Sequence, residues 1–116
     1  MKAFVLKKYG NPLSTVDMPV PEPGPRLVRM IASGVNHADE RTRTGEFKAV
    51  FRLDLPKVMG GELSGEVVAV GSQVTELAVG DQVYGYTGVV AMGTWAEFVV
   101  VDADALAPAP RSISLA

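Results

Sequence analysis

Valine dominates the apolar residues of this sequence, with 18 Val against 2 Ile. β-Branched side chains fit the pleated, half-buried surface of a sheet better than the surface of a helix. The Val-rich runs are short, and 12 Gly and 8 Pro, which interrupt strands and form turns, lie among them. Many short strands at close spacing are typical of β-barrels. We therefore predict a mostly β fold, a closed or partly closed β-barrel, with one or two short helices.

The predicted elements follow from the apolar patterns and the turn residues between them. A helix is expected over the polar segment His37–Thr44, where Asp39 and Arg43, four residues apart, would face each other. Asp102 or Asp104 is expected to cap one further helical turn. Strands are expected at residues 2–7, 13–16, 27–31 and 65–71, after the Gly80-Asp81 turn, and at 94–101, the longest of them.

Length and hydrophobicity allow one core. The chain has 116 residues, of which 47% are hydrophobic. A domain of this size buries roughly two-thirds of the surface that its unfolded chain exposes. A doubly wound dinucleotide-binding domain and a catalytic domain together need well over twice this length. We therefore expect a single domain over residues 1–116.

Charge and cysteine content exclude several classes of protein. Eleven Lys and Arg against 13 Asp and Glu give a net charge of −2, whereas proteins that bind nucleic-acid phosphates usually carry a basic excess. The sequence has no Cys, and a small secreted domain would normally need disulfides. No apolar run reaches the length of a membrane span or of a signal peptide. We expect a cytoplasmic protein with neither nucleic acid nor membrane as a partner.

Common motifs for phosphate binding and catalysis are missing from the sequence. Residues 80–85 have the glycine spacing of a phosphate loop, but Tyr86 stands where that motif needs Lys. No three glycines combine the spacing and the strand–helix context of a dinucleotide fingerprint. His37 is the only histidine, and we expect a local structural role for it, with general-base catalysis as the alternative.

Several motifs in a fixed order carry a family resemblance. They are Gly34-Val35-Asn36-His37-Ala38-Asp39, Arg43-Thr44-Gly45, residues 56–65, Val79-Gly80-Asp81-Gln82-Val83 and Gly93-Thr94-Trp95-Ala96-Glu97-Phe98. Together they resemble the N-terminal GroES-like domain of the medium-chain dehydrogenase/reductase superfamily, most closely its zinc-free quinone oxidoreductase (zeta-crystallin-like) branch. The resemblance covers nearly the whole chain and implies that residues 1–116 form a GroES-like, partly open β-barrel, the substrate-side domain. The family's dinucleotide-binding Rossmann domain would be absent from this chain and would act in cis or in trans.

The resemblance also implies a reaction and a cofactor. Members of this branch reduce quinones or α,β-unsaturated carbonyl compounds with hydride from a nicotinamide, usually NADPH. In zinc-dependent relatives a Cys ligand stands where Asn36 aligns, and a His-Glu pair stands where this chain has Gly61 and Glu62. Two zinc ligands are therefore missing, and the resemblance implies that no zinc or other metal is bound.

Asn36 is the residue at which the resemblance places both catalysis and cofactor binding. In this branch the equivalent Asn lies near the nicotinamide and the substrate, in the cleft between the domains. A neutral amide there can orient a carbonyl group or the nicotinamide carboxamide without adding charge. The alternative is that Asn36 only satisfies backbone groups at the bend after Gly34.

Further candidates lie after Asn36 and at Glu62. Some relatives have tyrosines where Arg41 and Phe47 stand here, and Arg41 is a catalytic candidate that could stabilise a developing oxyanion, or else a solvated arginine on the helix face. Glu62 either hydrogen-bonds locally or pairs with Arg41 or Arg43. Trp95 is expected to pack in the barrel. The candidates for the substrate cleft are Phe47, Glu62, Tyr84 and Tyr86, although tyrosines are also common in ordinary strands.

Two expectations concern the chain by itself. Hydride transfer needs a nicotinamide held against the substrate, so the chain without a cofactor domain should be catalytically silent. The face that packs on that domain would be apolar and exposed, which favours self-association as a homodimer. A different class of function is also open, a non-enzymatic binding or assembly module on the same barrel.

Overall fold

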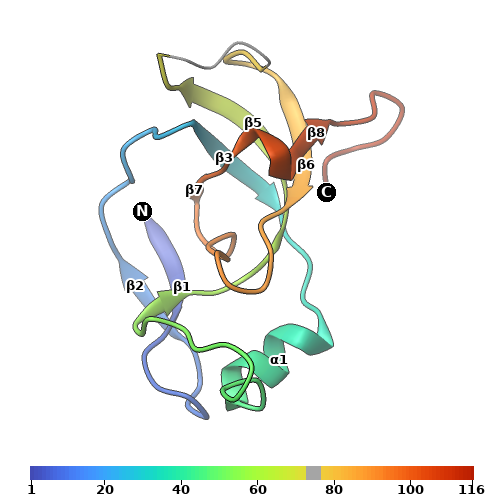
Figure 1. Ribbon diagram of the computed structural model, residues 1–116. Coiled ribbons are helices and arrows are strands. Elements are labelled where there is room, and N and C mark those ends of the chain that lie inside the picture. Colours follow the sequence, from blue (N-terminus) through green and yellow to red (C-terminus); the bar gives the residue numbers. More distant parts are fainter. Residues whose placement is uncertain (73–76) are drawn as a thin grey trace.

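The computed structural model describes residues 1–72 and 77–116, and the strands of this part of the chain form two antiparallel sheets (Figure 1). In the three-stranded sheet, β1 (Lys2–Leu6) lies between β2 (Ser14–Asp17) and β4 (Lys57–Val58). The five-stranded sheet has the order β7-β3-β5-β6-β8. Its strands are β3 (Arg26–Ala32), β5 (Glu62–Val70), β6 (Gln82–Tyr86), β7 (Phe98–Val100) and β8 (Leu106–Pro108).

The two sheets are held together by residues 94–97, which precede β7. The Phe4 amide of β1 donates to the Trp95 carbonyl (2.8 Å), and the Met30 amide of β3 donates to the Glu97 carbonyl (2.9 Å). Ala3 and Ala96 form an isolated bridge in the same place. No continuous ladder closes the barrel within the described residues. The predicted mostly β, partly open barrel is therefore confirmed.

The core consists of two clusters of buried side chains. Five of the six buried members of the first cluster are valines, which confirms that the Val-rich runs are strands of the barrel. In β5, Leu63, Gly65 and Val67 are buried, and the residues between them are not, because successive side chains of a strand point to opposite faces. The second cluster lies under the loops beside β1 and β4 and contains Leu6, Leu53, Met59 and Met92.

The predicted helix is confirmed with its predicted bounds, α1 (His37–Thr44). Asn36 is its N-cap, and Gly45 ends it with a φ of 87°, a left-handed conformation that glycine adopts without strain. A short 3-10 helix, η1 (Ala103–Ala105), lies where the turn after Asp102 was expected. Among the described residues, no helix is long and apolar enough to cross a lipid bilayer.

The predicted pairing of Asp39 with Arg43 is wrong. Asp39 accepts the backbone amide of Asn36 instead (2.8 Å), as the third residue of a helix often does for its N-cap. Arg43 pairs with Glu40 (Nε to Oε2, 2.8 Å) and also donates to the carbonyl of Asn11 (2.8 Å), so it ties α1 to the β1–β2 turn. The hydrogen bonds between the two side chains lower the pKa of Glu40 and raise the pKa of Arg43.

One strand prediction needs correction, and two short strands were missed. Residues 94–101 do not form one long strand, because residues 94–97 bond to β1 as well as to β3 and only Phe98–Val100 form a ladder. The longest described strand is β5, with nine residues. The strands β4 and β8 were not predicted, since two or three residues beside a proline carry too little pattern to be recognised.

We expect Met59→Ala to destabilise the fold more than any exposed apolar truncation. Met59 is fully buried in the second cluster, and shortening a buried Met to Ala typically costs about 2–5 kcal/mol. Val50→Ala is the matched control, because Val50 is 83% exposed and its truncation should change stability by less than about 0.5 kcal/mol. Urea unfolding of both variants measures the difference. Equal free energies of unfolding would contradict the placement of Met59.

Candidate functional site

The connection between β3 and α1, residues 33–36, is fixed by contacts to two other parts of the chain, the start of β5 and residues 94–95. The Ser33 hydroxyl donates to the Glu62 carbonyl at the start of β5 (2.6 Å) and also lies 3.1 Å from the Thr94 hydroxyl. The indole Nε1 of Trp95 donates to the Gly34 carbonyl (3.2 Å). Ordinary loops have few such contacts, so this connection can hold a functional group in a defined place.

Asn36 and Glu62, two of the predicted site residues, are brought together by this arrangement. The Asn36 side chain donates through Nδ2 to Oε1 of Glu62 (2.9 Å), although the two residues are 26 positions apart in the sequence. The backbone of Asn36 is held separately by Asp39 (2.8 Å). Both Asn36 and Glu62 are exposed, so the pair lies at the surface of the site. Glu62 therefore makes a hydrogen bond within the site, the first of its two predicted alternatives, and does not pair with Arg41 or Arg43.

Two glycines make room for side chains of the site. A Cβ on Gly34 would overlap the carboxylate of Glu62. A Cβ on Gly61 would lie 2.8 Å from the ring of Tyr86, which is closer than real contacts allow. Tyr86 is also the direct partner of Glu62 in the β5–β6 ladder, and it lines one small cavity together with Asn36.

The other predicted site residues lie at varying distances from this pair. Tyr84 is half-exposed on the same face of β6 as Tyr86 and lies opposite Ser64 of β5. Phe47 lies in the turns after α1, partly buried, with its ring centroid 5.6 Å from that of Phe51. Arg41 is exposed, and its guanidinium lies 3.9 Å from the Glu46 carboxylate rather than beside Glu62. The catalytic role of Arg41 stays a prediction.

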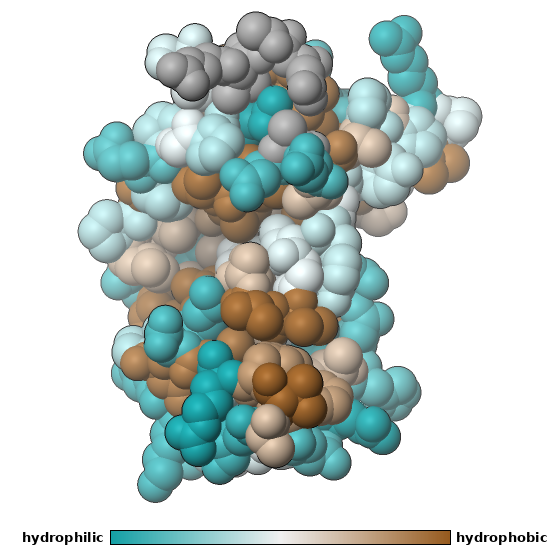
Figure 2. Space-filling view, viewed as in Figure 1, coloured by the Kyte–Doolittle hydropathy of each residue, from teal (hydrophilic) through white to brown (hydrophobic). Residues whose placement is uncertain are grey.

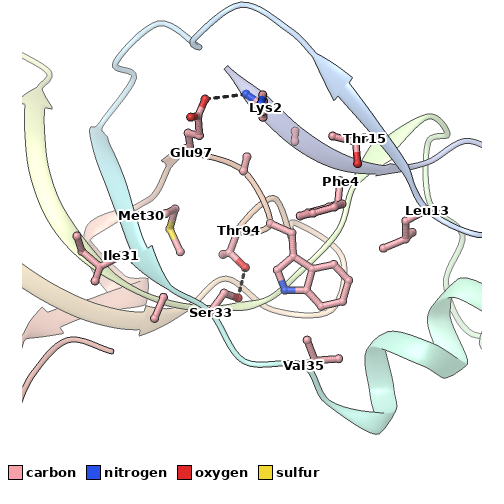
Figure 3. Close-up of a pocket in the computed structure, with 14 residues that line it drawn as sticks. Lys2, Phe4, Leu13, Thr15, Met30, Ile31, Ser33, Val35, Thr94 and Glu97 are labelled. Carbon is pink, nitrogen blue, oxygen red and sulfur yellow. Dashed lines mark hydrogen bonds between the residues drawn. The ribbon is translucent and has the colours of Figure 1, made fainter.

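Several cavities adjoin the site. A small one of about 20 Å³ is lined by Asn36, Gly61 and Tyr86, and two others are larger. The first of these two, of about 660 Å³, lies between β1, β3 and residues 94–97, and its wall is mostly apolar (Figure 3). Its polar groups bond to one another, Ser33 to Thr94 and the Lys2 amide to the Glu97 carboxylate (2.7 Å). Figure 2 shows apolar side chains gathered between the five-stranded sheet and α1. The second cavity, of about 530 Å³, is lined by β6, β8, Glu62 and Asp104.

Comparison with known proteins places this geometry in a family. Residues 22–111 match the family model of the alcohol dehydrogenase GroES-like domain. The chain belongs to this family. The match confirms the predicted GroES-like fold and the resemblance to the medium-chain dehydrogenase/reductase superfamily.

Relatives of this GroES-like domain include oxidoreductases. The chain is 40% identical over 116 residues to a quinone oxidoreductase of Pseudomonas aeruginosa, covering 97% of this chain and 34% of the relative. It is 34% identical to a chloroplastic NADPH-dependent alkenal/one oxidoreductase of Arabidopsis thaliana, covering 100% and 33%. A crystal structure of an alcohol dehydrogenase superfamily protein from Novosphingobium aromaticivorans matches with a TM-score of 0.90 and 39% identity, covering 99% and 36%. The chain thus spans about a third of the length of these relatives.

The residues at the zinc-ligand positions of the zinc-dependent relatives do not fit a zinc ion. Tetrahedral zinc takes thiolate, imidazole or carboxylate ligands. The amide nitrogen of Asn36 is a donor to Glu62 in this domain. Gly61 has no side chain, and a Cβ added there would lie 2.8 Å from the Tyr86 ring. Within residues 1–72 and 77–116, no three His, Cys, Asp or Glu side chains are grouped as a metal ion would require.

Sequence reasoning missed Ser33, Gly34 and Asp39 as parts of the site. The spacing of Asn36 and Asp39 is that of an N-cap and the third residue of a helix, which is a readable signal for the backbone hydrogen bond between them. Ser33 and Gly34 act through contacts with residues far away in the chain. Nothing in their local sequence indicates those contacts.

We expect Gly60→Ala to be more damaging than Gly88→Ala. Both glycines have a φ of 94°, so each substitution introduces similar backbone strain of about 1–2 kcal/mol. At Gly60 the new Cβ would also lie 2.5 Å from the Thr94 hydroxyl and against Trp95, whereas nothing lies within 4 Å at Gly88. Overpacking adds about 1–3 kcal/mol. Urea unfolding followed by Trp95 fluorescence measures both, and equal losses of stability would refute the close packing at Gly60.

Proposed function

We propose that this chain is the substrate-side domain of a zinc-independent, NADPH-dependent oxidoreductase that reduces quinones or α,β-unsaturated carbonyl compounds by hydride transfer. The observation that carries the proposal is the side-chain amide of Asn36, which is exposed at the surface of the site and donates to Glu62 (2.9 Å), while Asp39 holds the backbone of Asn36. The names of two relatives, a quinone oxidoreductase and an NADPH-dependent alkenal/one oxidoreductase, support the substrate class and the cofactor.

The residues of the site suit the binding of a nicotinamide and a carbonyl compound. An amide nitrogen has two N–H donors, and the hydrogen bond to Glu62 uses one of them. The other can donate to the oxygen of the nicotinamide carboxamide or of the substrate carbonyl, and it does so without placing a charge beside the ring. Tyr84 and Tyr86, both about half exposed, line the second cavity together with Glu62 and offer it flat aromatic faces and hydroxyls. When bound, the nicotinamide supplies the hydride.

Zinc-independence rests on the chemistry of Asn36, Gly61 and Glu62. The amide nitrogen of Asn36 donates to the carboxylate of Glu62, and Gly61 has no side chain. Of these three positions, Glu62 alone therefore offers a zinc ligand, its carboxylate. Polarisation of the acceptor carbonyl would then fall to hydrogen-bond donors of the protein. The proposal includes a Rossmann domain, in cis or in trans, that holds the NADPH against this site.

The purified 116-residue chain should not oxidise NADPH with a quinone acceptor. Hydride transfer depends on a nicotinamide positioned near the reacting carbon, and positioning alone contributes about 7–11 kcal/mol to lowering such barriers. The decrease in NADPH absorbance, followed with several quinones and enones, measures this. Turnover above that of a heat-denatured sample would show that the chain binds and positions the cofactor by itself.

The chain should support catalysis when it replaces the matching third of the Pseudomonas aeruginosa quinone oxidoreductase, to which it is 40% identical. The exchanged enzyme should oxidise NADPH with a quinone or an enone. In this enzyme Asn36→Ala should lower kcat/KM about tenfold, the loss expected for one hydrogen bond of about 1.4 kcal/mol. Asn11→Ala is the matched control, because Asn11 is exposed in the β1–β2 turn and should leave the rate unchanged.

Two outcomes would speak against the proposed function. If the exchanged enzyme binds NADPH but does not oxidise it with any quinone or enone, the alternative of a non-enzymatic binding module is favoured. If it is active and Asn36→Ala has no effect, the chain supports the reaction but the Asn36 amide has no part in it. NADPH binding, measured by quenching of the enzyme's fluorescence, shows in both cases that the exchanged enzyme has folded.

A further inference from the structure

Among residues 1–72 and 77–116, one side chain is hydrogen-bonded to the carboxylate of Glu62. The carboxylate accepts from Nδ2 of Asn36, and no ion pair within 4 Å involves it in the described part of the chain. The two arginines that were candidates for pairing with it are used elsewhere, Arg41 near Glu46 and Arg43 on Glu40. Glu62 is exposed, so its contribution to the core is small. In the part of the chain that the structure describes, its carboxylate is therefore hydrogen-bonded to the predicted catalytic amide alone.

We propose that Glu62 is a positioning residue, which sets the orientation of the Asn36 amide and so decides which of its two ends faces the ligands. This inference rests on the proposed function, since it assigns a task to Glu62 within the same site. Glu62 acts through Asn36 and need not touch the substrate or the nicotinamide itself.

The chemistry of the two groups allows one orientation of the amide. A side-chain amide has a donor end, NH₂, and an acceptor end, the oxygen, and rotation by half a turn exchanges them. An ionised carboxylate only accepts hydrogen bonds. An Asn36 amide turned the other way would place its oxygen against the oxygens of Glu62, which is repulsive. Hydrogen bonds to a charged acceptor are also about twice as strong as neutral ones, so the orientation seen here is favoured.

The backbones that carry the two side chains are fixed independently of the pair. On the Asn36 side, Asp39 holds the backbone amide (2.8 Å). On the Glu62 side, Ser33 donates to the Glu62 carbonyl (2.6 Å). Because both backbones are already held, little conformational entropy is lost when the two side chains meet, and an exposed hydrogen bond can persist against competition from water.

Gly34 supplies the space that the carboxylate occupies. A Cβ at this position would overlap Oε2 of Glu62, so any other residue would push the carboxylate away from its place. Gly34 has no φ in the left-handed region, and its backbone conformation does not demand glycine. The need for glycine at position 34 therefore comes from the Glu62 carboxylate. A substitution of Gly34 is thus a second way, separate from any change at Glu62, to disturb the hydrogen bond between Asn36 and Glu62.

The orientation has a consequence for ligand recognition. With one N–H on Glu62, the second N–H of Asn36 remains a donor for a carbonyl oxygen, and the amide plane fixes its direction relative to Glu62. An amide free to rotate would present its oxygen for part of the time, and that oxygen repels a carbonyl oxygen. Glu62 thereby favours substrate carbonyls and nicotinamide carboxamides whose oxygen faces the second N–H of Asn36.

The test is nitrogen-15 NMR of the side-chain amides of the 116-residue chain itself. The sequence contains two Asn, so Asn11, which is exposed, is the internal reference for a freely solvated amide. The Asn36 signals should differ from those of Asn11 in chemical shift and exchange with water several-fold more slowly. Glu62→Ala and Gly34→Ala should move them towards the Asn11 values, whereas Glu62→Gln should retain them, because the Gln oxygen still accepts.

The matched control is Glu66→Ala. Glu66 lies on the same strand, and its carboxylate pairs with Arg29 (2.6 Å) rather than with Asn36. This variant removes the same charge from β5 and should leave the Asn36 signals unchanged. If Glu62→Ala also leaves them unchanged, or if Glu66→Ala alters them equally, the positioning role is overturned.

The exchanged enzyme separates this inference from the proposed function. Glu62→Ala should lower kcat/KM about as much as Asn36→Ala, roughly tenfold, and the double variant should be no slower than either single one. Glu62→Gln should restore most of the rate. Additive losses, or a normal rate in Glu62→Ala beside a slow Asn36→Ala, would overturn the inference while the proposed function stands. An inactive exchanged enzyme that still binds NADPH would instead overturn the proposed function.

Discussion

The hydrogen bonds of Thr94 and Trp95 are the contacts on which the rest of this structure depends. The Trp95 backbone accepts from the Phe4 amide of β1 (2.8 Å) and donates to the Met59 carbonyl beside β4 (2.9 Å), and its indole donates to Gly34. These bonds join both sheets to the β3–α1 connection. Breaking one of them leaves a partly buried polar group without its partner, which costs about 1–3 kcal/mol. The close approach that Trp95 makes is possible because Gly60, at a φ of 94°, has no side chain there.

The candidate site follows from this anchoring. Asn36 and Glu62 lie 26 residues apart in the sequence. Asn36 ends the β3–α1 connection and Glu62 is the first residue of β5, so neither lies in the middle of a helix or strand. Ser33 ties the connection to the start of β5, and Thr94 bonds to the same Ser33 hydroxyl. The Asn36 amide and the Glu62 carboxylate meet because Ser33, in the connection that carries Asn36, bonds directly to the Glu62 backbone. A functional group on a loop can be placed as accurately as one on a strand when the loop is bound in this way.

The sequence predicted those parts of the fold that a local residue pattern determines. The helix bounds at Asn36 and Gly45 follow from capping chemistry, and the alternation around Val67 follows from strand geometry. The prediction failed where contacts are distant in sequence. Residues 94–97 have the composition of a strand, and their division between β1 and β3 depends on pairing that no local window contains. Asn36 and Glu62 were recognised as candidates, but their hydrogen bond to each other is also a distant contact.

The relation between positions 36, 61 and 62 shows how one scaffold accommodates different chemistry. The resemblance places a thiolate and an imidazole at the first two positions in zinc-dependent relatives, and this chain has an amide and a glycine there. An amide offers what a thiolate cannot, an N–H donor, and the neighbouring carboxylate of Glu62 accepts it. The space that a side chain at position 61 would need is taken by the ring of Tyr86. Because Ser33, Asp39 and Thr94 help to hold the backbone at these positions, the side chains at the site can change while its framework stays.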